Sequence, residues 1–200
     1  MDRAQTIPAM TRESLERQNS LPMKVAAGSF STSARDELVN ERALRLHPHP
    51  RVVLPDPIDW HMDPLGERNW SAQLHMFRWL RPLVKDAVEW NNERSRELLG
   101  HYIRTWAEAS LPRETAPSFA WADMIDAVRV FELMAAHDAV SSSDQLIVEN
   151  LLFEHGRWLE NDANLGHANH AVWQHLALFV LGHLFEQTEW AKLGKARLED

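Results

Sequence analysis

Apolar residues recur at intervals of three and four along most of the chain from residue 70 onward, which is the spacing of one face of an α-helix. Separate runs of this kind are joined by short polar connections, and no segment alternates apolar and polar residues as a series of strands would. The sequence therefore predicts an all-α fold of antiparallel helix pairs. The runs contain Trp70, Leu74, Phe77, Leu80 and Val84; Leu98, Leu99, Tyr102, Ile103 and Trp106; Trp121, Met124, Ile125, Val128 and Phe131; Ile147, Leu151, His155 and Trp158; and Val172, Leu176, Phe179, Val180 and Leu184.

Prolines and capping residues predict where several helices begin and end. Pro82 lies inside the first run and is expected to kink or restart the helix. The second helix is expected to end before Pro112, and the fourth to begin at Ser143 with Asp144 in its first turn. The last residues still have a helical composition, and we expect the chain to be a truncated piece of a helical domain.

The first fifty residues differ from the rest of the chain. They are polar and weakly periodic, and we expect little regular structure there apart from a short helix over Ser33–Leu46 with Ser33 as its N-cap. The proline-rich stretch 47–60 should be an extended connector, with at most a brief strand at Arg51–Leu54. We therefore divide the chain into a polar segment, 1–50, and a helical domain, 51–200.

Composition excludes several classes of function. The 200 residues contain no cysteine, which excludes disulfides and a thiolate nucleophile, and the formal net charge of −8 argues against a nucleic-acid binder. No apolar stretch approaches the ~20 residues of a membrane span, and the first thirty residues lack the apolar core of a signal peptide. The eleven histidines form no helical pair with an intervening glutamate, so a metal site is not expected. No other cofactor is expected either.

Two groups of residues are candidates for chemistry. Asn169 and His170 stand where a loop should become the fifth helix. Asn169 caps that helix while His170 faces solvent, or the pair binds a carboxylate at the positive helix end and exchanges a proton. The chain also has nine tryptophans against one tyrosine. Most should be core, and the alternative is that Trp60, Trp121 and Trp173 line a groove and stack on sugar rings.

Four segments, taken in order, resemble the N-terminal domain of the heparinase II/III-like polysaccharide lyases, which include heparin-sulfate and oligoalginate lyases. They are IDWHMDPLGERNWSAQLHMFRWLRPL (58–83), LLGHYIRTW (98–106), SFAWADMIDAVRVFELM (118–134) and GHANHAVWQHLALFVLGHLF (166–185). The resemblance implies an incomplete α/α toroid of helical hairpins. The antiparallel β-sandwich that follows the toroid in this family has no counterpart in these 200 residues.

The resemblance also implies a reaction, β-elimination at a uronic acid, in which a base removes the C5 proton and the 4-O-glycosidic bond breaks. On this basis Asn169 would neutralise the uronate carboxylate and His170 would be, or support, the base. Arg129 matches a family arginine that binds acidic groups of the substrate, and its alternative is a surface ion pair with Glu132 or Asp126. Trp173 stands where many relatives have glutamate. The relatives' catalytic tyrosine lies beyond the end of this chain, and Tyr102 does not match it.

The expected function is that of the N-terminal helical domain of a lyase that cleaves uronic-acid-containing glycans, with an acidic polysaccharide or oligosaccharide as partner. The alternatives are a non-catalytic helical module that binds carbohydrate or protein, and a lyase fragment that self-associates through exposed apolar surface. Relatives are commonly periplasmic. Since the first residues resemble no signal peptide, a cytoplasmic location is the alternative.

Overall fold

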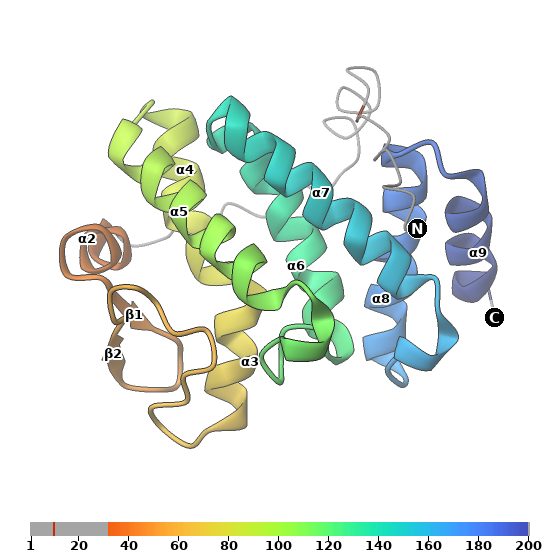
Figure 1. Cartoon of the computed structure of the whole chain (residues 1–200), viewed down its shortest axis with the longest axis horizontal. Helices are drawn as coiled ribbons and strands as arrows, with labels where there is room; N and C mark the ends of the chain where they lie inside the picture. Colours follow the sequence, from red (N-terminus) through yellow and green to blue (C-terminus); the bar gives the residue numbers. More distant parts are fainter. Residues whose placement is uncertain (1–9, 11–31, 200) are drawn as a thin grey trace.

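The computed structural model describes Met10 and residues 32–199 of the chain (Figure 1). The expectations for residues 1–31, including the lack of a signal peptide, concern a stretch that lies, apart from Met10, outside the described residues.

Helices dominate the described part of the chain, which confirms the predicted all-α class. The α-helices are α2 (Thr32–Glu41), α3 (Arg68–Met76), α4 (Arg81–Glu89), α5 (Glu93–Ser110), α6 (Asp123–Ala136), α7 (Ser142–Leu159), α8 (Asn169–Leu184) and α9 (Thr188–Glu199). Short 3-10 turns link them: η1 (Arg78–Leu80), η2 (Arg113–Thr115), η3 (His137–Ala139) and η4 (Asp162–Asn164).

The helices form consecutive hairpins, α4–α5, α6–α7 and α8–α9, that lie side by side (Figure 1). One layer consists of α3 and α4, then α6, then α8, and the other contains α5 beside α7. Each layer is held by contacts between successive hairpins, which is the arrangement expected of an incomplete α/α toroid. Within the last hairpin, a Cβ on Gly182 would overlap the backbone of Ala191, so glycine permits the close approach of α8 and α9.

The predicted helix ends are close to those of the structure. After α3 the chain turns through Phe77 in a left-handed conformation (φ 67°), and it restarts as α4 with Pro82 in the first turn, where a missing N–H costs nothing. Helix α5 ends before Pro112, as predicted. Ser141 caps α7 by accepting a hydrogen bond from the Asp144 amide at 3.3 Å, so the helix begins one residue before the predicted Ser143.

The N-terminal side of the division predicted at residue 50 contains a shorter helix than expected. Helix α2 ends at Glu41, and the last residues of the predicted Ser33–Leu46 helix form strand β1 (Ala43–Arg45) instead. β1 pairs antiparallel with β2 (Arg51–Val53), with Leu44 opposite Val52, which confirms the predicted brief strand. Leu38 on α2 and Leu44 on β1 are buried in the same core as the helices.

Tryptophans supply much of that core, as expected from their spacing. Trp60, Trp70, Trp106, Trp121 and Trp190 are buried, whereas Trp90 and Trp173 are exposed. In the part of the chain that the structure describes, no helix combines the length and the apolarity that a membrane crossing needs.

Candidate active site

Asn169 and His170 occupy the first turn of α8. The residue before the helix, Ala168, has an unusual backbone conformation (φ 52°, ψ −129°), and no side chain caps the helix. Asn169 is already inside the helix, so its interpretation as the N-cap is wrong. Its side chain is exposed and has no hydrogen-bond partner among residues 32–199, which leaves the amide available to a ligand at the positive end of the helix.

The His170 imidazole is paired with the carboxylate of Asp123, the first residue of α6. Nδ1 of His170 lies 2.8 Å from each Asp123 oxygen, and the two side chains are 40% and 47% exposed. A carboxylate accepts, so the Nδ1–H donates, and Nε2 keeps its lone pair with no partner in the part of the chain that the structure describes. This is the arrangement of a general base whose tautomer and orientation are fixed by an acidic neighbour.

Backbone strain flanks this pair on both sides. Asp123 (φ 54°) and Ala168 (φ 52°) both lie in the left-handed half of the backbone map, where residues with a Cβ are uncommon. Such conformations cost on the order of 1–3 kcal/mol each and persist only where the surroundings enforce them. Strain of this kind concentrates at functional sites. Here it lies at Asp123 itself and at Ala168, two residues before His170.

Gln174, one turn beyond His170 on α8, provides that enforcement. Its side chain is fully buried and connects three segments. Oε1 accepts a hydrogen bond from the Gly166 amide at 2.7 Å, while Nε2 donates to the backbone oxygens of Asp123 at 2.9 Å and Asn164 at 3.2 Å. One amide therefore fixes the start of α6 and the loop before α8 relative to each other.

Gly166 leaves room for the Asp123 carboxylate. A Cβ at this position would overlap Asp123 Oδ1, the end of a rotatable side chain that can move away, and would lie 3.2 Å from His170 Cβ. We therefore expect Gly166→Ala to separate Asp123 from His170 with a loss of stability of less than about 1 kcal/mol. The ¹⁵N shifts of the His170 ring should then report a mixture of tautomers, whereas the wild type shows one. Retention of a single tautomer would show that Asp123 does not orient the ring.

Beneath the pair lies a fully buried carboxylate, Asp126. It accepts hydrogen bonds from Trp158 Nε1 at 2.9 Å and from Gln174 Nε2 at 3.2 and 3.3 Å. Burial raises the pKa of Asp126 to about 6, against the opposing influence of the Arg129 cation. Asp126 is thus linked to Asp123 through Gln174, and its charge interacts with the Arg129 cation in the core.

Arg129 is that cation, and all of its hydrogen bonds are internal. Its guanidinium donates to His155 Nε2 at 3.0 Å, to the His75 backbone oxygen at 2.8 Å and to the Ala120 backbone oxygen. It also lies 4.1 Å from the centre of the Trp106 ring. Because Arg129 has no exposed surface, the alternative of a surface ion pair is wrong, and its direct contact with substrate stays a prediction. Glu132 is paired with Arg81 instead.

The three tryptophans singled out from the sequence lie in different surroundings. Trp60 is 2% exposed and donates to the Thr105 hydroxyl at 3.2 Å. Trp121 is 9% exposed and lies against the Arg113 guanidinium, 4.6 Å from its ring centre. Trp173, one turn after Asn169, is 37% exposed. Of the three, Trp173 has the surface that stacking on a sugar requires, and stacking by Trp60 and Trp121 stays a prediction.

Two buried neutral histidines make the fold sensitive to acid. Burial, assisted by the Arg129 cation, lowers the pKa of His75 to about 3 and that of His155 well below its usual value of 6.5. Their stabilisation is complete above pH 6.5 and is lost as the pH falls, because the unfolded chain takes up these protons first. Asp126 has the opposite effect. Because its pKa is raised, its contribution to the free energy of unfolding decreases as the pH rises from about 4 to about 6. The net fall in the free energy of unfolding between pH 6.5 and pH 5 should be about 2 kcal/mol, measurable by urea denaturation. A flat profile would show that the two imidazoles are solvated.

Sequence reasoning missed Asp123, Gln174 and Gly166. Gln174 carried a usable signal, because it is four residues after His170 and so lies on the same helix face. Asp123 is 47 residues away from His170, and nothing in local spacing links them. Among the residues that the structure describes, no group of three or more histidine or acidic side chains could hold a metal ion.

No family model and no curated protein matches this sequence. Two solved structures of heparan sulfate lyase HepC from Pedobacter heparinus are similar in fold. One superimposes with a TM-score of 0.70 at 13% identity, and a HepC mutant superimposes with a TM-score of 0.69 at 14% identity. Each match covers 93% of this chain and 33% of HepC, so the chain spans about a third of the length of the protein it resembles. The chain therefore has the helical fold found in part of a heparan sulfate lyase, as the resemblance implied.

Proposed function

We propose that this chain is the helical part of a polysaccharide lyase that acts on uronic-acid-containing glycans by β-elimination. The observation that carries the proposal is the hydrogen bond between His170 Nδ1 and Asp123 at the start of α8, where neither His170 Nε2 nor the Asn169 amide has a partner among residues 32–199. The fold shared with part of HepC, a heparan sulfate lyase, supports a glycan ligand.

The chemistry follows from these groups. The Asn169 amide and the free N–H groups of the first turn of α8 would bind the uronate carboxylate and reduce its charge. The C5 proton is then acidic enough to pass to His170 Nε2, and the electron pair left on C5 forms the double bond to C4. The glycosidic oxygen leaves C4 with the electrons of the broken C–O bond and takes a proton from solvent water. Asp123 stabilises the imidazolium that results. Trp173 would stack on a neighbouring sugar. Arg129 would stabilise the site from the interior of the fold.

The test is elimination by the chain as it stands. The purified protein is incubated with heparosan, heparan sulfate and polymannuronate, and the ultraviolet absorbance of the unsaturated uronate is recorded. We expect product from at least one polymer. If a folded, helical sample gives no product from any of the three polymers, the proposal is wrong.

Binding without product would favour the alternative of a non-catalytic carbohydrate-binding module. The exposed Asn169 amide and the exposed Trp173 ring support this second candidate, since both can contact a glycan without chemistry.

A further inference from the structure

A second candidate site lies near α2 and β1, away from the start of α8. A pocket of about 530 Å³ opens between α2 and β1 on one side and α3 and η1 on the other. Its volume falls within the range of about 300–1,000 Å³ that is usual for small-molecule sites. Figure 1 shows α2 and the β-hairpin at the left of the fold and α8 at the right, so this pocket is separate from the Asn169–His170 pair.

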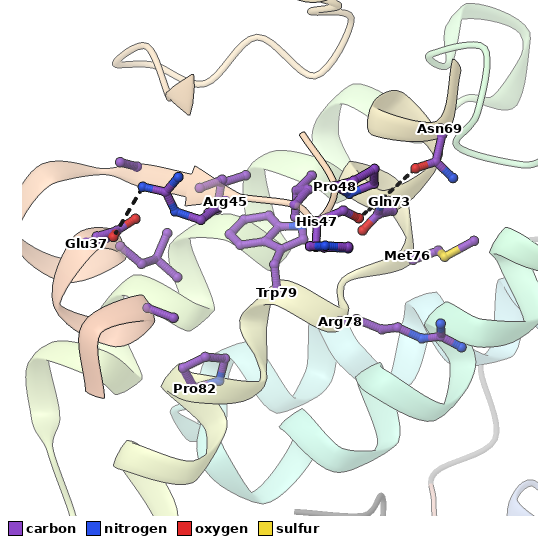
Figure 2. Close-up of a pocket in the computed structure, with 15 residues that line it drawn as sticks. Glu37, Arg45, His47, Pro48, Asn69, Gln73, Met76, Arg78, Trp79 and Pro82 are labelled. Carbon is purple, nitrogen blue, oxygen red and sulfur yellow. Dashed lines mark hydrogen bonds and ion pairs between the residues drawn. The ribbon is translucent and has the colours of Figure 1, made fainter. Parts of the chain in front are cut away.

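An indole forms the centre of the pocket. Trp79 is half-buried, and its Nε1 donates to the Leu74 backbone oxygen at 2.8 Å, which fixes the orientation of the ring. Tyr102 packs edge-on against Trp79 with ring centres 5.0 Å apart, and Trp60 lies 6.4 Å away. Trp79 is therefore a rigid aromatic surface supported from behind. Figure 2 shows it between Glu37 and Arg45 on one side and the polar side chains of α3 on the other.

The charged side of the pocket has unused hydrogen-bonding capacity. Arg45 Nη2 and Glu37 Oε1 are 3.8 Å apart, which is an ion pair but longer than a hydrogen bond. Arg45 is 57% exposed, and neither side chain makes a hydrogen bond within the described ranges. A ligand can therefore accept from the guanidinium and donate to the carboxylate at the same time.

The amide side of the pocket is organised in the same way. Gln73 Nε2 donates to the His47 backbone oxygen at 3.0 Å and to Asn69 Oδ1 at 2.7 Å, and His49 Nε2 lies 3.0 Å from the same Asn69 oxygen. These bonds fix both amides and leave Gln73 Oε1 and Asn69 Nδ2 without partners among the described residues. The amide side of the pocket thus offers a ligand one acceptor, on Gln73, and one donor, on Asn69.

We propose that this pocket binds one sugar ring of a glycan, as a recognition site distinct from the elimination site. A pyranose presents an apolar C–H face that suits an indole, and its rim of hydroxyls both donates and accepts, as the two polar flanks require. A nucleotide would also stack on Trp79, but its phosphate only accepts hydrogen bonds, whereas a sugar hydroxyl can also donate one to the Glu37 carboxylate beside Arg45. The site does not depend on the elimination chemistry of His170.

The test measures binding without turnover. Asn169→Ala/His170→Ala protein is titrated calorimetrically with a heparosan hexasaccharide, and we expect saturable binding at one site. Adding Arg45→Ala should raise the dissociation constant by about tenfold, because hydrogen bonds to a charged group are lost. Arg157→Ala is the matched control, since Arg157 is an arginine of similar exposure (48% against 57%) outside the pocket, and it should leave the constant unchanged.

Three results would overturn this proposal. They are no binding of the hexasaccharide to the folded double variant, equal effects of Arg45→Ala and Arg157→Ala, and binding of adenosine monophosphate in place of the sugar. A failure of elimination by the wild-type chain would contradict the proposed function and leave this measurement intact. The two proposals can therefore fail separately.

Discussion

Replacing His170 with alanine is expected to lower the rate of uronate elimination by about 10²–10⁴-fold, the usual contribution of a general base. His170 is the one imidazole at the start of α8 that is both accessible and oriented by a carboxylate, through two contacts of 2.8 Å with Asp123. The rate of appearance of the unsaturated product, followed on the polymer that the wild type cleaves best, checks this directly.

His183→Ala provides the control for this prediction. His183 is an exposed histidine in the last turn of the same helix, so its removal tests for a general effect of shortening a side chain on α8. Its rate should equal that of the wild type. Equal rates for His170→Ala and the wild type would exclude His170 as the base.

Asn169→Asp should also slow the reaction, because the substitution places a negative charge beside the substrate carboxylate.

Arg129→Met should cause the largest loss of stability, about 3–5 kcal/mol. The change keeps the approximate volume of the side chain but leaves the fully buried Asp126 without its cation and the acceptor on His155 without its donor. A loss of this size is a large part of the 5–15 kcal/mol that stabilises a typical domain. Urea denaturation at pH 7 measures it.

Arg157→Met is the control for the buried arginine. Arg157 is 48% exposed and pairs with Glu154 on the surface of α7, so its removal should cost no more than about 1 kcal/mol. Because the pKa of Asp126 is about 6, the cost of Arg129→Met should also be smaller at pH 5, where that carboxyl is protonated. Similar losses for the two variants at pH 7 would show that the interior solvates Asp126 without Arg129.

The helical part of the fold could be predicted because local sequence determines it. Pro82 restarts a helix wherever the chain places it, and Ser141 and Asp144 mark the beginning of α7 by chemistry confined to one turn. The sequence predicts a helix where strand β1 lies, since nothing within Ala43–Arg45 indicates a strand. Its conformation comes from pairing with β2, which is a contact between segments.

The candidate site also has residues that could be predicted from the sequence and residues that could not. Asn169 and His170 could be singled out because they lie at a helix start, which the apolar period of α8 reveals. Asp123 and the buried position of Arg129 could not, because both depend on how α6 packs against α8 and α3. Periodicity cannot distinguish a buried arginine from an exposed one. Only the hydrogen bonds of Arg129 to three separate segments explain its position.

The helix that carries Asn169 and His170 is packed on both sides, by α6 and α7 on one side and by α9 on the other. Its first turn therefore projects from a helix that other helices hold in place, and the contacts with Asp123 orient the imidazole when the chain folds, before any ligand arrives. Because the imidazole is already oriented, it needs little rearrangement during the reaction. Ligand affinity at this end of α8 should consequently depend on the fit of the ligand and only weakly on motion of the protein.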